Sequence, residues 1–229
     1  MPEQILIIED EPDIVETVRY NLEKTGFDVL SSGDAETALD ILNQRIPDLI
    51  LLDLILPGMN GFDFCKEVKR EPRTRAIPIC VLSARRHEVD RVLAFELGVD
   101  NYIVKPFSHR ELILRIRGIL QRVNQLNQRN DDRLAYGILS VDSAAHKVTV
   151  GNETKNLTPI EFQLLFTLME RAGRVQSRRD LLNAVWGYNH LGNGRMVDAH
   201  IRRMRAKLGT AQEMIRTVRG VGYCFKPIE

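Results

Sequence analysis

The sequence predicts an α/β domain with a doubly wound, five-stranded parallel sheet, followed by a small α+β domain of the winged helix-turn-helix type. Three observations lead to this prediction. In the first half of the 229 residues, short apolar runs alternate with amphipathic stretches. In the second half, strand patterns come first, then three helical patterns and a hairpin. The two halves also differ in charge, which indicates two domains with different partners.

Five short runs rich in Ile, Val and Leu in the first half are typical of strands buried on both faces. Amphipathic patterns separate them, beginning with Ile14, Val18 and Leu22 at a spacing of four before Gly26. Such alternation predicts a parallel sheet, whose binding site lies beyond the carboxyl ends of the strands. The runs are residues 5–8, 29–30, 49–52, 79–82 and 102–104, and the later helical patterns cover 38–42, 62–69, 88–97 and 109–121.

Residues 123–133 are rich in amide and charged side chains and contain almost nothing to bury. We interpret them as a linker that extends the preceding helix by about a turn. The predicted domains are therefore residues 1–122 and residues 134–229.

The second domain begins with alternating patterns at 138–141 and 147–150, which predict two strands, and Gly151-Asn152 is a candidate hairpin turn. A helix follows, because Thr158 suits the N-cap, Pro159 the first helical position and Glu161 the third. A second helix starts in a similar way at residues 177–180 and reaches about residue 186. A loop (187–194), a third helix (195–208) and a hairpin (215–225) with Gly220 and Gly222 at its tip complete the outline of a winged helix-turn-helix.

The composition, with 28% charged and 44% hydrophobic residues, is that of an ordinary globular protein. Its net charge of +1 is a cancellation. Residues 1–123 hold 16 basic and 21 acidic residues, whereas residues 124–229 hold 16 and 10, so the second half suits a polyanionic partner. No apolar run approaches the roughly 18 residues of a membrane helix, and no signal peptide is readable. Three distant cysteines support neither a zinc site nor a disulfide framework, so we expect a cytoplasmic protein without membrane association.

Acidic residues follow two of the predicted strands: Glu9-Asp10 the first and Asp53 the third. A single such residue is usually a helix cap or a turn former. Carboxylates converging at one sheet edge repel one another and require a cation, and oxygen ligands suit Mg²⁺. The fourth strand ends at Ser83-Ala84 and the fifth at Lys105, which add a hydroxyl and an ammonium. Together these groups could serve phosphoryl transfer with Asp53 as nucleophile.

Residues 1–122 resemble the receiver domain of bacterial two-component response regulators. The resemblance rests on Glu9-Asp10, Asp53, Ser83-Ala84 and Lys105-Pro106-Phe107, and on the segment 56–61, Leu-Pro-Gly-Met-Asn-Gly. It implies that Asp53 accepts phosphate from the histidine of a sensor kinase and that the bond before Pro106 is cis. It also implies that Mg²⁺ is held by Asp10, Asp53 and the carbonyl of Ile55, with Glu9 acting through water.

The resemblance also implies a switch made of Ser83 and Tyr102. Ile55 and Arg85 stand at the positions that tune the lifetime of the phosphate. Because the apolar Ile55 cannot position an attacking water, we expect slow autodephosphorylation and no further enzymatic activity.

The third helix of the second domain predicts a nucleic-acid interface. Val197, Ile201, Met204 and Leu208 form a core-facing stripe at 100° per residue. The opposite face carries arginines and small alanines, which suit close approach to a DNA groove. A solvated charged face is the alternative, but the preceding helix and a hairpin with Arg216 and Arg219 favour DNA. The residues of this face are Arg195, Ala199, Arg202, Arg203 and Ala206.

Residues 134–229 resemble the output domain of the OmpR/PhoB family, in the segments 157–162, 181–187, 197–208 and 215–225. The resemblance implies a transcription regulator, with phosphate-responsive genes among the expected targets. It implies a loop at 187–194 that faces RNA polymerase, which we carry as a hypothesis. Trp186 and Tyr223 are equally well explained as core anchors. The implied DNA contacts are Trp186, Arg195, His200, Arg202, Arg203, Arg205, Thr217 and Arg219.

Family members dimerise through the fourth helix, fifth strand and fifth helix of the receiver, so we expect a phosphorylation-dependent homodimer on tandem DNA half-sites. Asn101 replaces the usual Asp and leaves a neutral partner for Arg115. Two alternatives remain: a phosphatase, which would need an Asp where Ile55 stands, and a phosphorylation-independent DNA-binding regulator with a degenerate receiver. The mixed charges of the expected interface are Arg91, Glu96, Asp100, Glu111, Arg115 and Arg122.

Overall fold

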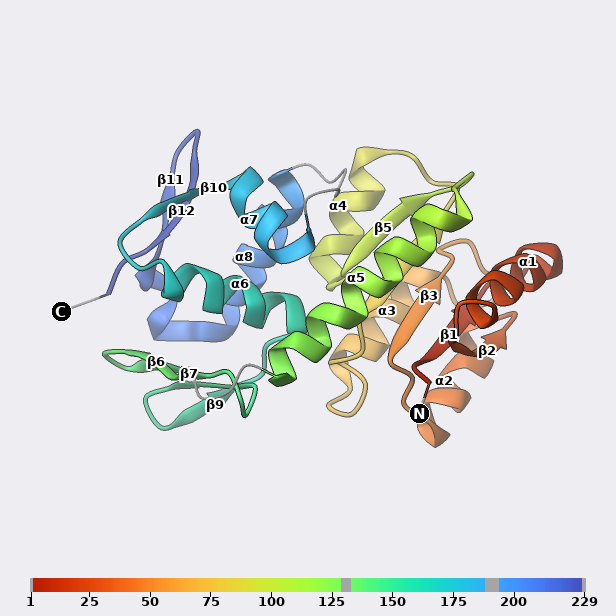
Figure 1. The fold of residues 1–229 in the computed structure, drawn as a ribbon, viewed down its shortest axis with the longest axis horizontal. Helices are drawn as coiled ribbons and strands as arrows, with labels where there is room; N and C mark the ends of the chain where they lie inside the picture. The colour runs from red at the N-terminus through yellow and green to blue at the C-terminus, as the bar shows by residue number, and fades with distance from the viewer. Residues whose placement is uncertain (1, 129–132, 188–193, 228–229) are drawn as a thin grey trace. The chain divides into compact units, whose positions relative to one another are not determined.

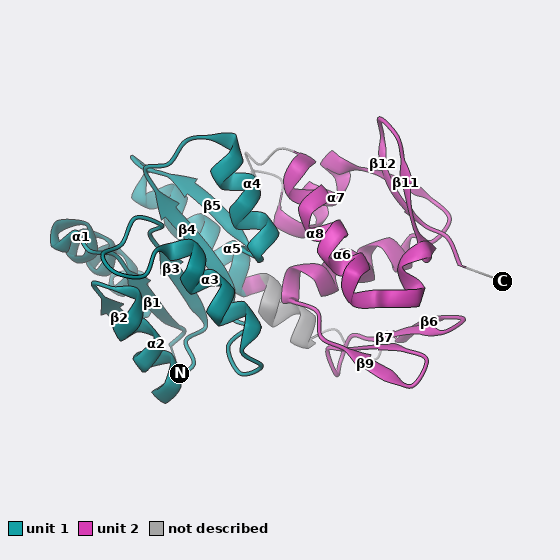
Figure 2. Ribbon diagram, turned by 180° about the vertical axis from the view of Figure 1, so that it is seen from behind, with its two compact units in different colours: residues 1–120 teal, residues 121–229 magenta. Residues whose placement is uncertain are grey.

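The computed structural model describes residues 2–128, 133–187 and 194–227, without the side chains of 122–128. The chain divides into two compact units, residues 1–120 and 121–229 (Figure 2). None of the described helices is both long and apolar enough to span a membrane.

The first unit is built on a five-stranded sheet of order β2-β1-β3-β4-β5, in which every neighbouring pair is parallel (Figure 1). This confirms the predicted doubly wound architecture. The strands are β1 (Gln4–Ile8), β2 (Asp28–Ser32), β3 (Leu49–Leu52), β4 (Ile79–Ser83) and β5 (Asn101–Val104). The helices are α1 (Pro12–Glu23), α2 (Ala35–Gln44), α3 (Gly61–Arg70), α4 (Glu88–Leu97) and α5 (His109–Gln128).

Helices cover both faces of this sheet. Val18 and Leu22 of α1 and Ile116 of α5 pack on one face against apolar side chains of β1, β3, β4 and β5. Figures 1 and 2 show α2, α3 and α4 on the opposite face. Because the central strands are buried on both faces, their sequences are apolar at nearly every position, as the pattern predicted.

The predicted linker is partly helical. Helix α5 continues to Gln128, about two turns beyond residue 121, and residues 129–132 lie outside the described part. The stretch consists mostly of Gln, Asn, Leu and Arg. Gln, Leu and Arg are good helix formers, so a polar composition does not end a helix.

The second unit contains two antiparallel sheets around a helical core. One sheet has the order β6-β7-β8-β9 and the other β10-β12-β11. The helices between them are α6 (Pro159–Glu170), α7 (Arg178–Trp186) and α8 (Gly194–Leu208), followed by a short 3-10 helix η1 (Gly209–Met214). The strands are β6 (Arg133–Tyr136), β7 (Leu139–Asp142), β8 (Lys147–Val150), β9 (Glu153–Lys155), β10 (Val175–Ser177), β11 (Ile215–Val218) and β12 (Gly222–Phe225).

Both predicted helix starts are confirmed as capping boxes. Thr158 accepts a hydrogen bond from the backbone N–H of Glu161, and the Glu161 side chain accepts one from the N–H of Thr158. Ser177 and Asp180 repeat the arrangement at α7. Gly151, with a φ of +58°, lies in the turn between β8 and β9, as predicted.

The sequence patterns did not mark three strands of the second unit, although the candidate hairpin turn at Gly151-Asn152 implies a strand after residues 147–150. β6 begins in the predicted linker, and its side chains are exposed or only half-buried, so no buried face marked it. β9 and β10 have three residues each, too few to show an alternating pattern. Gly222 was expected at the hairpin tip but pairs with Val218 as the first residue of β12.

Candidate functional site

The carboxyl ends of β1 and β3 bring two acidic side chains together. Ile8 pairs with Leu52, and the N–H of Asp53 donates to the carbonyl of Ile8 at 2.9 Å. The next residues, Glu9 and Asp53, therefore leave the sheet side by side. Both are buried, with exposed fractions of 2% and 5%. The predicted convergence of these carboxylates is thus present in the structure.

Lys105 joins these carboxylates from the end of β5. Its Nζ lies 2.6 Å from Glu9 Oε2 and 2.6 Å from Asp53 Oδ2, and 3.8 Å from Glu11 Oε1. The peptide bond between Lys105 and Pro106 is cis, as expected. One ammonium therefore serves two buried carboxylates and one exposed carboxylate, which leaves an excess of negative charge.

The ionisation of the pocket follows from this arrangement. Burial raises the pKa of Glu9 above its ordinary value, although the hydrogen bond from Lys105 opposes the shift. Burial alone would lower the pKa of Lys105, but the hydrogen bonds to Asp53 and Glu9 outweigh it and raise the pKa. The ammonium therefore stays charged while the buried Glu9 carboxylate remains under-compensated.

The fit to a cation can be judged from the oxygens of this pocket. Glu9 Oε1 is buried and has no hydrogen-bond partner among the described residues, while Asp53 Oδ1 accepts from the N–H of Ile55 at 2.9 Å. The predicted ligand Asp10 is exposed. Within the described part of the chain, no three acidic, His or Cys side chains converge as a metal cluster. The orphaned oxygen and the surplus of negative charge nevertheless fit a small divalent cation with oxygen ligands.

The predicted switch residues lie beside the pocket. Ser83 is fully buried at the end of β4, and Ala84 is exposed. The Tyr102 hydroxyl donates to the carbonyl of Arg85 at 2.9 Å, and burial raises its pKa to about 12. Tyr102 is thus turned inward, next to the Ser83 segment.

The β3–α3 loop contributes two features that sequence reasoning did not single out. The Glu36 carboxylate accepts a hydrogen bond from the N–H of Met59 at 2.9 Å. A Cβ at Gly61 would lie 2.6 Å from the carbonyl oxygen of Asp53, so only glycine fits there. The glycines of the Leu-Pro-Gly-Met-Asn-Gly segment signal the tight loop, but no local pattern marks Glu36, which is 23 residues away.

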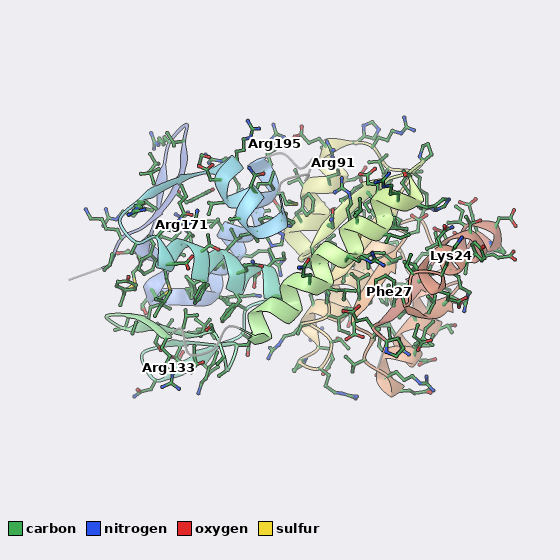
Figure 3. All side chains as sticks on the ribbon, in the orientation of Figure 1. Lys24, Phe27, Arg91, Arg133, Arg171 and Arg195 are labelled. Carbon is green, nitrogen blue, oxygen red and sulfur yellow. The ribbon has the colours of Figure 1, made fainter. Side chains whose placement is uncertain are left out.

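In the second unit, α8 and the β11–β12 hairpin expose several of the predicted DNA contacts. Arg195 points outward from the start of α8 (Figure 3), and Arg202 is exposed on the same helix. Thr217 and Arg219 are exposed on the hairpin, together with Arg216. These side chains form what we call the arginine face.

Four residues predicted for this surface are corrected by the structure. His200 and Trp186 are buried, with ring centroids 5.3 Å apart, and Ala199 is also buried. Because α8 packs against both α6 and α7, its buried arc is wider than the predicted stripe. Arg203 is directed to the buried Glu161, with Nη2 3.4 Å from Oε1. The core stripe Val197, Ile201, Met204 and Leu208 is confirmed.

Arg205, another predicted DNA contact, has a different environment. It donates to the carbonyl of Ile215 and, at 3.0 Å, to Thr217 Oγ1. It is therefore held against the hairpin. Sequence spacing could not predict this, because the partners lie on another element.

Of the residues expected at the dimer interface, one is fully buried and the others that the structure describes are at least partly exposed. Asp100 is fully buried, accepts from the N–H of Ile79 at 2.8 Å and lies 3.5 Å from Lys69 Nζ, so it cannot present a surface charge. Arg115 pairs with Glu111 at 2.7 Å and donates to Asn101 Oδ1 at 3.3 Å within the chain. Arg91 and Glu96 are half-buried on α4. The Arg122 side chain and loop residues 188–193 lie outside the described part.

Two family models match the chain. Residues 5–117 match the response regulator receiver domain, and residues 152–225 match the C-terminal domain of transcriptional regulatory proteins. Together the matched segments cover well over half of the sequence.

Known proteins are similar along the whole length. The phosphate regulon transcriptional regulatory protein PhoB of Escherichia coli K12 is 44% identical over 98% of both chains. The DNA-binding response regulator MtrA of Mycolicibacterium smegmatis is 40% identical over 99% of this chain and 98% of its own. Among solved structures, a RitR mutant matches with a TM-score of 0.76 and 31% identity over 99% of this chain and 100% of its own. DrrB, an OmpR/PhoB homologue from Thermotoga maritima, matches with a TM-score of 0.52 and 25% identity over the same shares.

Proposed function

The chain belongs to the OmpR/PhoB family of two-component response regulators, and from this premise we propose how its residues carry out the family's activity. It is a DNA-binding transcription regulator that joins a receiver domain to a DNA-binding domain. The family implies a sensor kinase as partner.

Asp53 is the proposed phosphoacceptor. A carboxylate oxygen of Asp53 attacks the phosphorus of the kinase phosphohistidine, an O–P bond forms, the N–P bond breaks, and the imidazole leaves with its electron pair and takes up a proton. The observation that carries this proposal is the 2.6 Å contact between Lys105 Nζ and the buried Asp53. The ammonium is placed to neutralise charge on the transferred phosphoryl oxygens.

Receiver domains bind Mg²⁺, and here Glu9, Asp10, Asp53 and the carbonyl of Ile55 would hold it. When bound, it supplies charge neutralisation to the phosphoryl oxygens. Ser83, at the end of β4, is the proposed hydroxyl partner of the phosphoryl group, and Tyr102 follows it in the switch.

The regulator is proposed to dephosphorylate itself slowly and to have no other enzymatic activity. Ile55 is half-exposed, two residues after Asp53, and its side chain carries no group that could orient a water. A phosphate half-life of seconds in the purified protein would contradict this.

Phosphorylation is proposed to shift the receiver towards a dimer, which places two DNA-binding domains on tandem half-sites. The charged residues Arg91, Glu96, Glu111 and Arg115 supply the proposed interface. The arginine face supplies the DNA contacts, with Arg219 entering the minor groove. The 44% identity to PhoB supports phosphate-responsive genes as targets.

The loop 187–194 is proposed to face RNA polymerase. Substitutions in it should abolish activation while leaving DNA affinity unchanged, measured by transcription in vitro and by DNA binding. Normal activation by such variants would refute the contact.

Labelling by a small acyl phosphate tests the receiver proposal. We expect stable, stoichiometric, Mg²⁺-dependent labelling that Asp53→Asn abolishes. Absence of labelling in the wild type would favour a phosphorylation-independent regulator, and rapid turnover would favour a phosphatase. Asp53→Ala should also remove phosphodonor-dependent dimerisation; an unchanged response of the dimer affinity would refute the coupling.

A further inference from the structure

An acidic residue lies within the basic surface of α8. Asp198 follows Arg195 by one turn and precedes Arg202 by one turn, and its side chain is 39% exposed. A carboxylate beside DNA phosphates opposes binding, because the phosphate backbone carries most of the charge of the complex. We therefore expect a contact of Asp198 that offsets this unfavourable charge.

Two side chains from other elements hold Asp198. Arg178, the first residue of α7, places Nε 2.8 Å from Asp198 Oδ1. The hydroxyl of Tyr223, on β12, donates to the same oxygen at 2.6 Å. Hydrogen bonds to a charged group are short and strong, so this contact fixes the first half of α8 against α7 and the hairpin.

The ring of Tyr223 is the centre of this cluster. The guanidinium of Arg178 lies 5.1 Å from the ring centroid and that of Arg205 lies 5.5 Å from it, both within cation–π range. Arg205 continues to Thr217 Oγ1 on β11. The cluster therefore connects the start of α7, two turns of α8 and both strands of the hairpin.

The residue at the start of α8 leaves space for the Arg178 side chain. A Cβ at Gly194 would lie 2.8 Å from Cδ of Arg178, so the stem of Arg178 occupies the space beside the first turn. A side chain there would displace the arginine that pairs with Asp198.

We propose that Asp198 and Tyr223 are positioning residues that hold α8 and the β11–β12 hairpin in one fixed relation, so that helix and hairpin tip engage DNA together. The proposal rests on the DNA surface proposed above. It also places Arg205 in the link between the two elements.

A fixed relation has a thermodynamic consequence. When α8 docks, the hairpin tip is already placed, so its contact costs little additional ordering. If the link is broken, the tip must be ordered separately, and its contribution to affinity falls. The effect of Arg202→Ala should be the same with and without the Tyr223 hydroxyl, because Arg202 lies on α8 itself and not on the hairpin.

The experiment is a set of double-mutant cycles in the full-length, phosphodonor-treated chain. The probe is one DNA duplex selected from a random pool by the wild-type protein. Arg219→Ala and Arg202→Ala are each measured in the wild type and in Tyr223→Phe, Asp198→Ala and Asp198→Asn. Tyr136→Phe is the matched control, because it removes the same hydroxyl from a tyrosine that packs 5.2 Å from Phe225 of the same strand β12.

We expect Arg219→Ala to weaken binding about tenfold in the wild type and in Tyr136→Phe, but only about twofold in Tyr223→Phe and Asp198→Ala. Asp198→Asn keeps an oxygen acceptor and should retain most of the tenfold effect. The Arg202→Ala effect should be equal in the wild type, Tyr136→Phe and Tyr223→Phe, which a general loss of folding would not produce.

If Arg219→Ala reduces DNA affinity equally with and without the Tyr223 hydroxyl, the proposed link between α8 and the hairpin is wrong. The proposed DNA surface would not be affected by that result. If neither arginine substitution weakens binding in the wild type, the proposed surface itself is wrong, and the link falls with it. Should Tyr223→Phe fail to fold, the partly exposed Asp198→Ala decides the same question.

Discussion

Each unit of this regulator contains a buried cluster of carboxylates and cations, but the ratio of the two charges is opposite in the two units. In the first unit, the single ammonium of Lys105 contacts both Glu9 and Asp53. In the second, the single carboxylate of Glu161 receives both Arg203, at 3.4 Å, and Lys207, at 2.5 Å. The first centre thus sets one cation against two buried carboxylates, and the second sets two cations against one buried carboxylate.

This difference in charge ratio indicates a different role for each cluster. A buried centre short of positive charge is compensated when a cation binds, which suits a site of chemistry. Glu161 is fully buried and also closes the capping box of α6, so its two cations tie α8 to the start of α6. That centre is complete within the chain and suits a structural role.

Lys105→Ala should have the largest effect, because it leaves the Glu9 and Asp53 carboxylates buried without their ammonium. We expect a loss of about 3 kcal/mol in the free energy of unfolding, limited by uptake of a proton at Glu9. Urea unfolding followed by circular dichroism measures it. Lys66→Ala is the control, since the Lys66–Asp63 pair has the same 2.6 Å distance but is exposed, and little change is expected. Equal losses in the two variants would show that burial is not the cause.

Glu161→Ala should destabilise the second unit by about 2 kcal/mol, through the lost cap and the lost buried ion pairs with Arg203 and Lys207. Trp186 is the only tryptophan of the chain and is buried in this unit, so its fluorescence reports the transition. Asp180→Ala removes the same capping-box position from α7, where the side chain is exposed, and should cost clearly less. If the two variants lose the same free energy of unfolding, the contacts of Glu161 with α8 do not contribute to stability.

Glu9→Gln should change stability in the opposite direction. Removing the under-compensated charge is expected to raise the free energy of unfolding at neutral pH by about 1 kcal/mol in the presence of a chelator. Urea unfolding of the two proteins side by side gives the difference. Destabilisation would mean that Lys105 already balances the pocket.

The smallest effect concerns one buried tyrosine in each unit. Burial raises the pKa of both Tyr102 and Tyr223 to about 12, and at Tyr223 the hydrogen bond to Asp198 adds to it. Because the folded value lies above the ordinary value of 10, the unfolded chain loses these protons first. Stability should therefore fall as pH rises from 10 towards 12, by a few tenths of a kcal/mol per group at pH 10.

Ultraviolet absorbance of the phenolates, with Tyr102→Phe and Tyr223→Phe, assigns the two groups. Each variant should lack one late titration. Ionisation of either tyrosine near pH 10 in the folded protein would contradict the burial seen here.

The sequence was sufficient for the architecture of the first unit and the convergence of its pocket. Strand order places the residues after β1 and β3 side by side, so the positions of Glu9 and Asp53 follow from topology. Local patterns also predicted both capping boxes. These features depend on neighbours along the chain or on strand ends, which a sequence displays directly.

The sequence did not predict whether a polar side chain is exposed to solvent or contacts a residue distant along the chain. Helix spacing placed His200 and Arg203 on or near the outer face of α8, but packing against two helices buries the first, and Glu161, 42 residues earlier, attracts the second. Asp100 was expected at the surface because it is charged, yet a backbone N–H and Lys69 satisfy it inside. Such choices are decided by tertiary contacts.

The two glycines of the hairpin suggest how this domain could diversify among descendants. A Cβ at Gly222 would lie 2.0 Å from the carbonyl oxygen of Gln176, so the base of the hairpin tolerates no side chain. Gly220 has open space around its Cα, and its φ of +75° makes a single side chain strained but not obstructed. Substitutions and insertions can therefore change the tip, the part proposed to enter the minor groove, while the base of the hairpin keeps its glycine.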